Sequence, residues 1–293
     1  MKVFGIDVSK WQGNFDFAAA KEQGVKFVIL RGAYHKTKDT KFEQFYTSCK
    51  SLNLPVGVYQ YSMARTVAEA KAEAEYLYQN CLKGKRFEYP IYIDIEDKTQ
   101  LALPKKLLTD IAVAWCECLE AKGFYVGIYA GQYQFRDNMD DSRLKSYSHW
   151  IPQWGAKCTY DDNSVLDMWQ FGGEVNKLRS NVIAGVVTDQ NYAYKDFPAI
   201  IKAKKLNGYN SSATVQKVPA SNASTPQTVF KEGDRITLKS GAKYSNGFDI
   251  PAWVRKQKLY IRSAEGKDGT YCISTLKTGD ITGRVHKKYL AKA

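Results

Sequence analysis

Short apolar runs recur along the first part of the chain and predict eight strands. Most of them are nearly continuous rather than alternating, which is typical of parallel strands that helices cover on the outside. The runs lie at residues 3–8, 26–31, 55–61, 89–95, 124–130, 149–154, 166–171 and 184–189.

Helical patterns fill the gaps between the first five runs. The clearest are TVAEAKAEAEYLYQNCL (66–82) and PKKLLTDIAVAWCECLEAKG (104–123), the second with Pro at its start and Gly at its end. The gaps after the fifth run are too short and too polar for full crossover helices. The pattern therefore predicts an α/β fold, a modified TIM-like barrel with a thinned second half.

The composition changes after residue 205. Residues 206–227 are rich in Ser, Asn, Ala and Thr and predict a flexible linker. In residues 228–293 short strand-like runs alternate with Gly, Asp and Asn turns, which predicts a small antiparallel β-barrel. We therefore expect a catalytic barrel over 1–205, a linker, and a second domain over 228–293.

The net charge of +13 is concentrated in the last part of the chain. Residues 201–293 hold 18 Lys and Arg against 6 Asp and Glu, whereas residues 1–200 hold 25 against 24. A basic module favours an anionic polymer, which charge alone leaves open as nucleic acid, acidic membrane or anionic cell wall. The tail has no RNP-like or helix-turn-helix signature, so we expect no nucleic acid as a partner.

Targeting and metal signals are weak. No apolar stretch is long enough to span a membrane, so we expect no membrane partner, and the start MKVFGIDVSKWQG lacks the apolar run of a signal peptide. We accordingly expect synthesis in the cytoplasm; if the target lies outside, another factor must let the protein out. The six Cys and three His form no CxxC pair and no zinc-binding spacing, so we expect neither a zinc site nor a cofactor.

Carboxylates end several of the predicted strands. In YPIYIDIED (89–97) the alternation of a strand places Tyr92, Asp94 and Glu96 on the inward face and the isoleucines on the outward face. Asp7 ends the first strand and Asp189 the eighth, which are neighbours in a closed barrel. Four carboxylates are thus expected at the carboxyl-terminal rim, where barrel enzymes form their clefts.

Crowded carboxylates raise one another's pKa, so at least one keeps a proton near neutral pH. A protonated acid beside ionised partners is the equipment for cleaving a glycosidic bond. Each aspartate could instead be a cap or turn residue, and an acidic rim could also hold magnesium or calcium. Candidate sugar contacts end the same strands and are equally compatible with packing: Tyr59, Tyr61, Tyr129, Trp154, Trp169 and Asn191.

The segments GIDVSKWQG, FVILRGAY, GVYQYS, YIDIED, GIYAG, HWIPQW, MWQF and VVTDQN resemble, in this order, the lysozymes of glycoside hydrolase family 25. The resemblance implies a (β/α)5β3 barrel that cleaves the β-1,4 bond between N-acetylmuramic acid and N-acetylglucosamine. It implies Glu96 as proton donor, Asp94 as its acidic partner, and Asp7 and Asp189 completing the site. HWIPQW departs from the family, which more often has Ala after the Ile and Tyr in place of Trp154.

The tail, in GDRITLKSGAKYSNG and IPAWVRKQKLYI, is similar to bacterial SH3-like wall-binding modules. A muramidase joined to such a module resembles a bacteriophage endolysin and also a bacterial autolysin. We therefore expect a hydrolase of peptidoglycan, of the Gram-positive type, whose tail holds anionic wall polymers. The alternative is a non-catalytic wall-binding protein on the same fold.

Overall fold

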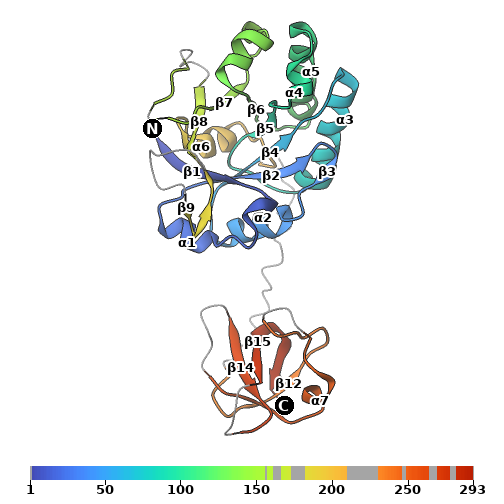
Figure 1. The fold of residues 1–293 in the computed structure, drawn as a ribbon, viewed down its shortest axis with the longest axis vertical. Coiled ribbons are helices and arrows are strands. Elements are labelled where there is room, and N and C mark those ends of the chain that lie inside the picture. The colour runs from blue at the N-terminus through green and yellow to red at the C-terminus, as the bar shows by residue number, and fades with distance from the viewer. Residues whose placement is uncertain are drawn as a thin grey trace. The chain divides into compact units, whose positions relative to one another are not determined.

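The computed structural model describes residues 2–155, 157–160, 166–172, 182–209, 230–245, 249–263, 269–277 and 282–292. The chain divides into two compact units, Met1–Gln216 and Lys217–Ala293, each with its own sheet and core (Figure 1).

Eight strands of the first unit close into a barrel. The sheet is closed because β1 pairs with both β2 and β11. All neighbours are parallel except β11, which runs antiparallel to β8 and β1. Seven of these strands confirm predicted runs: β1 (Val3–Val8), β2 (Val28–Tyr34), β4 (Val56–Tyr61), β5 (Ile91–Asp94), β6 (Val126–Tyr129), β7 (Ser148–Pro152) and β8 (Leu166–Gly172). The eighth strand of the barrel is β11 (Asp189–Ala193).

The predicted eighth strand, 184–189, is wrong. Val186–Val187 (β10) instead pairs with Val182–Ile183 (β9) in a separate two-stranded sheet, and the barrel is closed by β11. An apolar run predicts a strand but does not indicate which other strand it pairs with. Asp189 therefore begins the closing strand rather than ending it. Because β11 runs opposite to its neighbours, its first residue still lies at the rim where the parallel strands end.

Helices cover the first half of the barrel. The two clearest predicted helices are confirmed as α3 (Val67–Leu77), which a π-helical turn continues to Leu82, and α5 (Lys105–Glu120). Between β6 and β7 lie two short helical turns, Gln134–Asn138 and Asp141–Arg143. Among the described residues, the second half is thinned as expected. The other helices of this unit are α1 (Phe17–Glu22), α2 (Phe42–Ser51), α4 (Lys98–Leu101) and α6 (Phe197–Ala203).

Two apolar cores lie on the two faces of the barrel sheet. The outer core, between strands and helices, includes Ile91, Ile93 and Ile95. The inner core fills the barrel with large rings, including Tyr92 and Trp150. This confirms the alternation predicted for β5. The few polar side chains in this interior have partners, such as Ser148, which is hydrogen-bonded to the Tyr92 hydroxyl at 3.1 Å.

The first residues of the predicted linker pack on the barrel. Asn207 is fully buried; its side chain accepts from the Tyr125 N–H at 2.7 Å and donates to the Tyr89 carbonyl at 2.9 Å. The Tyr209 hydroxyl donates to Glu88 at 2.6 Å. The barrel therefore extends at least to Tyr209. The rest of the predicted linker, 210–227, lies outside the described residues.

The described residues of the second unit form an antiparallel sheet in the order β15-β14-β13-β12-β16, a short helix, α7 (Ala252–Arg255), and a 3-10 turn, Lys287–Tyr289. Its core includes Ile236, Ile261, Tyr271 and Val285. The antiparallel sheet predicted for this unit is confirmed. Its strands are β12 (Arg235–Leu238), β13 (Leu259–Ile261), β14 (Thr270–Ser274), β15 (Gly283–His286) and β16 (Leu290–Lys292). Within the described parts of the chain, no helix has the length and apolar character needed to cross a membrane.

Candidate active site

The end of β5 carries two of the four predicted carboxylates. Asp94 is the last residue of the strand and is 4% exposed, between Tyr61 of β4 and Tyr129 of β6. Its Oδ1 is buried and has no hydrogen-bond partner among the described residues. Glu96 follows two residues later and is exposed. One strand end thus presents a buried and an accessible carboxyl.

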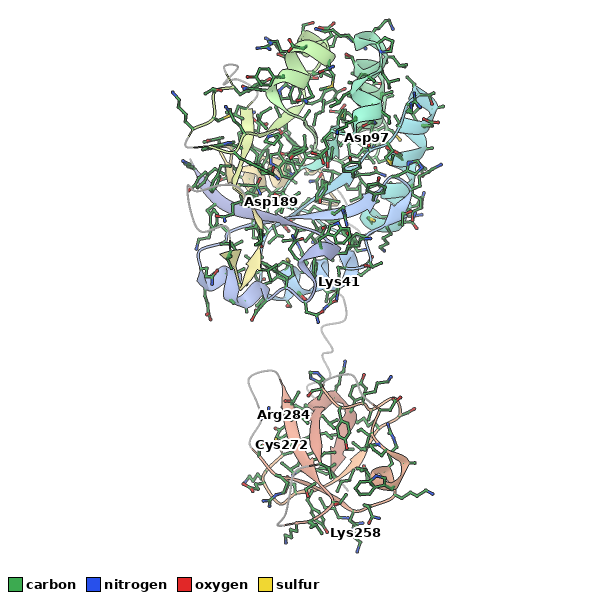
Figure 2. The ribbon with its side chains drawn as sticks, viewed as in Figure 1. Lys41, Asp97, Asp189, Lys258, Cys272 and Arg284 are labelled. Carbon is green, nitrogen blue, oxygen red and sulfur yellow. The ribbon has the colours of Figure 1, made fainter. Side chains whose placement is uncertain are left out.

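Asp7 and Asp189 are cross-strand partners in the antiparallel pair of β1 and β11. Asp7 is buried, and its Oδ1 accepts from the amides of Asn191 at 2.8 Å and Gln170 at 3.1 Å. Asp189, labelled in Figure 2, is half-buried. The structure therefore brings the second predicted pair of carboxyls to the same rim.

Three donor groups orient the amides that hold Asp7. The indole N–H of Trp150 donates to Asn191 Oδ1 at 2.8 Å. The hydroxyl of Tyr129 and the indole N–H of Trp154 both donate to Gln170 Oε1, at 2.9 Å and 3.2 Å. With both amide oxygens occupied, their NH₂ groups face the carboxylate. Sequence reasoning missed Trp150 and Gln170. Their signal was a polar group on the inward face of an apolar strand.

Burial raises the pKa of all four carboxyls, and repulsion by neighbouring carboxylates adds to it at Asp94, Glu96 and Asp189. Burial raises the pKa of Asp7 to about 6, although the two amide hydrogen bonds lower it. Burial, with the charges of Asp7 and Glu96, raises the pKa of Asp189 to about 8. The pKa values of Asp94 and Glu96 are raised by the same two causes, burial first. The cluster thus retains protons near neutral pH and titrates as a unit.

A buried arginine offsets part of this negative charge. Arg31, inward-facing on β2, donates from Nε to Asp39 Oδ2 at 2.8 Å, and its charge lowers the pKa of Asp94. Asp39 also accepts from the backbone N–H of Lys10, in the loop after β1. The signal for Arg31 was an isolated charge in the apolar run KFVILR, which sequence reasoning passed over.

The predicted sugar contacts are only partly brought together. Tyr59 and Tyr61 are half-buried at the rim, and Trp154 is 49% exposed. Tyr129 is 8% exposed, so its ring packs against Trp150 and its hydroxyl holds Gln170. Asn191 is fully buried and reaches Asp7 rather than the surface.

The prediction for Trp169 is wrong. Its ring is 2% exposed in the outer core, beside Phe171 and Tyr192, so it faces away from the barrel interior. Side chains alternate along β8, and Gln170 takes the inward position. For metals, no group of three or more His, Cys, Asp or Glu in the described segments is placed to hold an ion.

Comparison with known proteins gives the same picture for the barrel. The family model for glycosyl hydrolases family 25 matches residues 6–178. The autolytic lysozyme of Clostridium acetobutylicum is 28% identical over 176 residues, which cover 59% of this chain and 52% of that protein. This chain therefore spans about half the length of that relative.

Solved structures share the fold. A lysozyme from Streptomyces coelicolor superposes with a TM-score of 0.59 at 20% identity, covering 71% of this chain and 98% of that one. The CTP1L endolysin gives a TM-score of 0.58 at 24% identity, covering 69% of each chain.

Proposed function

The chain belongs to glycosyl hydrolases family 25, and from that membership we propose that it is a muramidase acting on peptidoglycan. The bond cleaved is the β-1,4 bond between N-acetylmuramic acid and N-acetylglucosamine. The observation that carries the proposal is the rim at which β1, β5 and β11 bring together four carboxyls with raised pKa values. Relatives named lysozyme and endolysin support it.

The four carboxyls divide the chemistry by their exposure. Glu96 is the accessible one, and its raised pKa favours the protonated form, so it donates the proton to the leaving glycosidic oxygen. Asp94 and Asp189 stabilise positive charge that develops on the muramyl ring or position its acetamido group. Asp7, held by Asn191 and Gln170, supports the pKa values of its neighbours.

The bond cleaved is tested by mass analysis of fragments released from purified peptidoglycan. The proposal expects new reducing ends on N-acetylmuramic acid. New reducing ends on N-acetylglucosamine, or new free amino groups from cut peptides, would refute it.

The proton donor is tested by Glu96→Gln, which keeps the shape and removes the acidic proton. Turnover should fall by at least about a hundredfold, since a general acid contributes on the order of 10²–10⁴ in rate. Glu117→Gln, on the exposed face of α5, is the matched control and should leave turnover unchanged. A folded Glu96→Gln variant with near-normal turnover would contradict the assignment.

For the second unit we propose an SH3-like module that binds a Gram-positive type of cell wall through its anionic polymers, as in an endolysin. Three features support this: an independent antiparallel sheet, the excess of Lys and Arg over Asp and Glu, and Trp253, which is 60% exposed. Tyr271 is fully buried in the core of this unit and cannot contact a wall polymer.

Sedimentation with purified walls across a salt series tests this division of labour. The full chain should sediment, and a chain ending at Gln216 should bind more weakly while it still cleaves soluble glycan fragments. Part of the binding should weaken with salt, because exposed charges are screened beyond about 8 Å at physiological ionic strength. If both chains sediment with walls equally, the second unit is not the targeting module.

A further inference from the structure

Two tyrosine rings form a stacked pair beside the carboxyl rim. Tyr34 ends β2 and Tyr61 ends β4, and the two residues are partners in the parallel register. Their ring centroids lie 4.9 Å apart and their planes differ by 18°. Tyr34 is 44% exposed, although most large apolar side chains of this unit are buried. The pair therefore presents an aromatic surface to solvent.

Tyr61 connects this surface to the catalytic carboxyls. It lies opposite Asp94 in the pairing of β4 with β5, and its hydroxyl is hydrogen-bonded to Asp97. Burial and then the charges of Glu96, Asp94 and Asp97 raise the pKa of its phenol. Tyr61 thus has its hydroxyl at the acidic site and its ring against Tyr34, which lies one strand further from Asp94 in the sheet.

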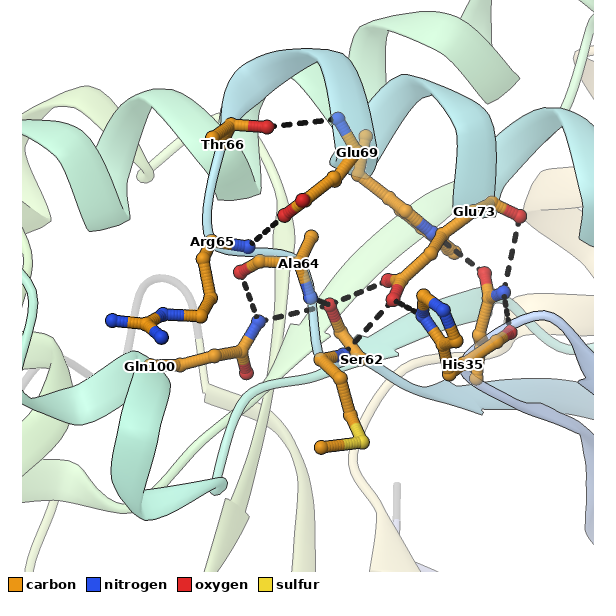
Figure 3. Close-up of polar contacts among 11 residues, drawn as sticks. His35, Ser62, Ala64, Arg65, Thr66, Glu69, Glu73 and Gln100 are labelled. Carbon is orange, nitrogen blue, oxygen red and sulfur yellow. Dashed lines mark hydrogen bonds and ion pairs between the residues drawn. The ribbon is translucent and has the colours of Figure 1, made fainter.

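The backbone beneath the two rings is fixed by His35. This residue adopts a left-handed conformation, φ 49°, in the turn that follows β2. Its N–H donates to the Tyr61 carbonyl at 2.7 Å, and its Nδ1 lies 2.6 Å from Oε1 of Glu73 (Figure 3). Glu73 comes from α3 and is fully buried. The end of β2 is thereby tied to the end of β4 and to the helix behind them.

The same buried carboxylate fixes the loop after β4. Glu73 accepts from the Ser62 hydroxyl at 2.6 Å and from the Met63 N–H at 3.0 Å. Gln100, in α4 just beyond the catalytic segment, donates to Ser62 Oγ at 3.0 Å and to the Ala64 carbonyl at 2.8 Å (Figure 3). The rings therefore rest on a preformed support, which reduces the ordering cost of binding a ligand.

We propose that Tyr34 and Tyr61 form a sugar-binding shelf, an additional subsite that holds a pyranose ring of the glycan strand away from the cleaved bond. An exposed ring on a rigid backbone suits the apolar C–H face of a pyranose, and the phenol hydroxyl adds a polar contact at the edge. The ligand is a neutral hexosamine unit of a polymer long enough to reach from the carboxyls to Tyr34. The proposal rests on the glycan-cleaving function proposed above.

The test compares Tyr34→Ala with Tyr34→Phe on soluble, uncrosslinked glycan strands of graded length. On long strands Tyr34→Ala should raise KM about three- to tenfold with kcat unchanged, which is the range that one aromatic contact supplies. On the shortest fragment that is still cleaved, the two variants and the unaltered protein should have the same KM. Tyr34→Phe keeps the ring and should stay within about twofold of the unaltered protein on every strand.

A KM that is unchanged on long strands, or raised equally at every length, would overturn the shelf. A second measurement is independent of turnover: Glu96→Gln protein with and without Tyr34→Ala is titrated with N-acetylglucosamine oligomers. Weaker binding confined to the longer oligomers supports the shelf, and equal binding of all lengths overturns it. If the unaltered protein cleaves no glycan strand, the proposed function fails, and the titration still decides whether the shelf exists.

Discussion

Replacing Asp189 with Asn should stabilise the barrel while it impairs catalysis, and the gain should grow with pH. The pKa of Asp189 is raised from 3.8 to about 8 by burial and by the charges of Asp7 and Glu96. The folded state therefore holds this proton more tightly than the unfolded chain does. That advantage to folding is complete below pH 3.8 and disappears as pH rises through about 8. Above pH 8 the ionised carboxylate opposes folding, and Asn removes that opposition.

The size of the gain follows from the shift. Each pKa unit corresponds to about 1.36 kcal/mol, so about four units give at most about 6 kcal/mol above pH 8. Asp189 is half-buried, and solvent screening reduces this to about 3 kcal/mol at pH 9 and about 1 kcal/mol at pH 5. For a domain of this size, about 3 kcal/mol corresponds to a Tm increase of about 6–12 °C.

Calorimetry of the full chain at pH 5, 7 and 9 measures the effect on the barrel transition. Asp110→Asn is the matched control, because ion pairs with Lys106 and Arg143 lower the pKa of that surface carboxyl. Its replacement should leave Tm unchanged or lower it at neutral pH. The reasoning is refuted if Asp189→Asn lowers Tm at pH 9, or if its gain is the same at pH 5 and pH 9.

Three further outcomes follow from buried contacts. Asn207→Ala leaves the Tyr125 N–H and the Tyr89 carbonyl without their side-chain partner and should lower the free energy of unfolding by about 2–6 kcal/mol, measured by urea titration. The control is Asn53→Ala, at an exposed residue with the same left-handed backbone, which should cost much less. Equal losses for the two variants would contradict this. A chain ending at residue 206 should likewise melt below one ending at residue 216, and coincident melting curves would refute it. Arg31→Met should raise the pKa of Asp94 and move the acidic limb of the pH–activity profile upward by about one pH unit. Arg31→Lys keeps the positive charge and should leave the profile unchanged. If the acidic limb of the Arg31→Met variant does not move, the charge of Arg31 does not have this role.

Local pattern was sufficient for most of the barrel and for its two central carboxyls. Seven of the eight barrel strands were predicted correctly, because an apolar run between turn signals forms a strand almost regardless of its neighbours. The inward placement of Tyr92 and Asp94 followed from alternation, which is a property of the strand itself. The uneven distribution of charge, with residues 1–200 near balance and residues 201–293 strongly basic, likewise follows from the sequence alone.

The tertiary structure determined the features that depend on contacts between segments distant in sequence. Val186–Val187 of the apolar run pairs in a hairpin, and the more polar strand β11 closes the barrel. In β11, Asn191 donates to Asp7 and accepts from Trp150, contacts that sequence pattern does not predict. The inward turn of Gln170 sends its neighbour Trp169 to the outer core. The stacking of Tyr34 on Tyr61 also depends on a register between strands distant in sequence. Alternation determines which residues of a strand share a face, but the contacts of that face are determined only when the sheet is assembled.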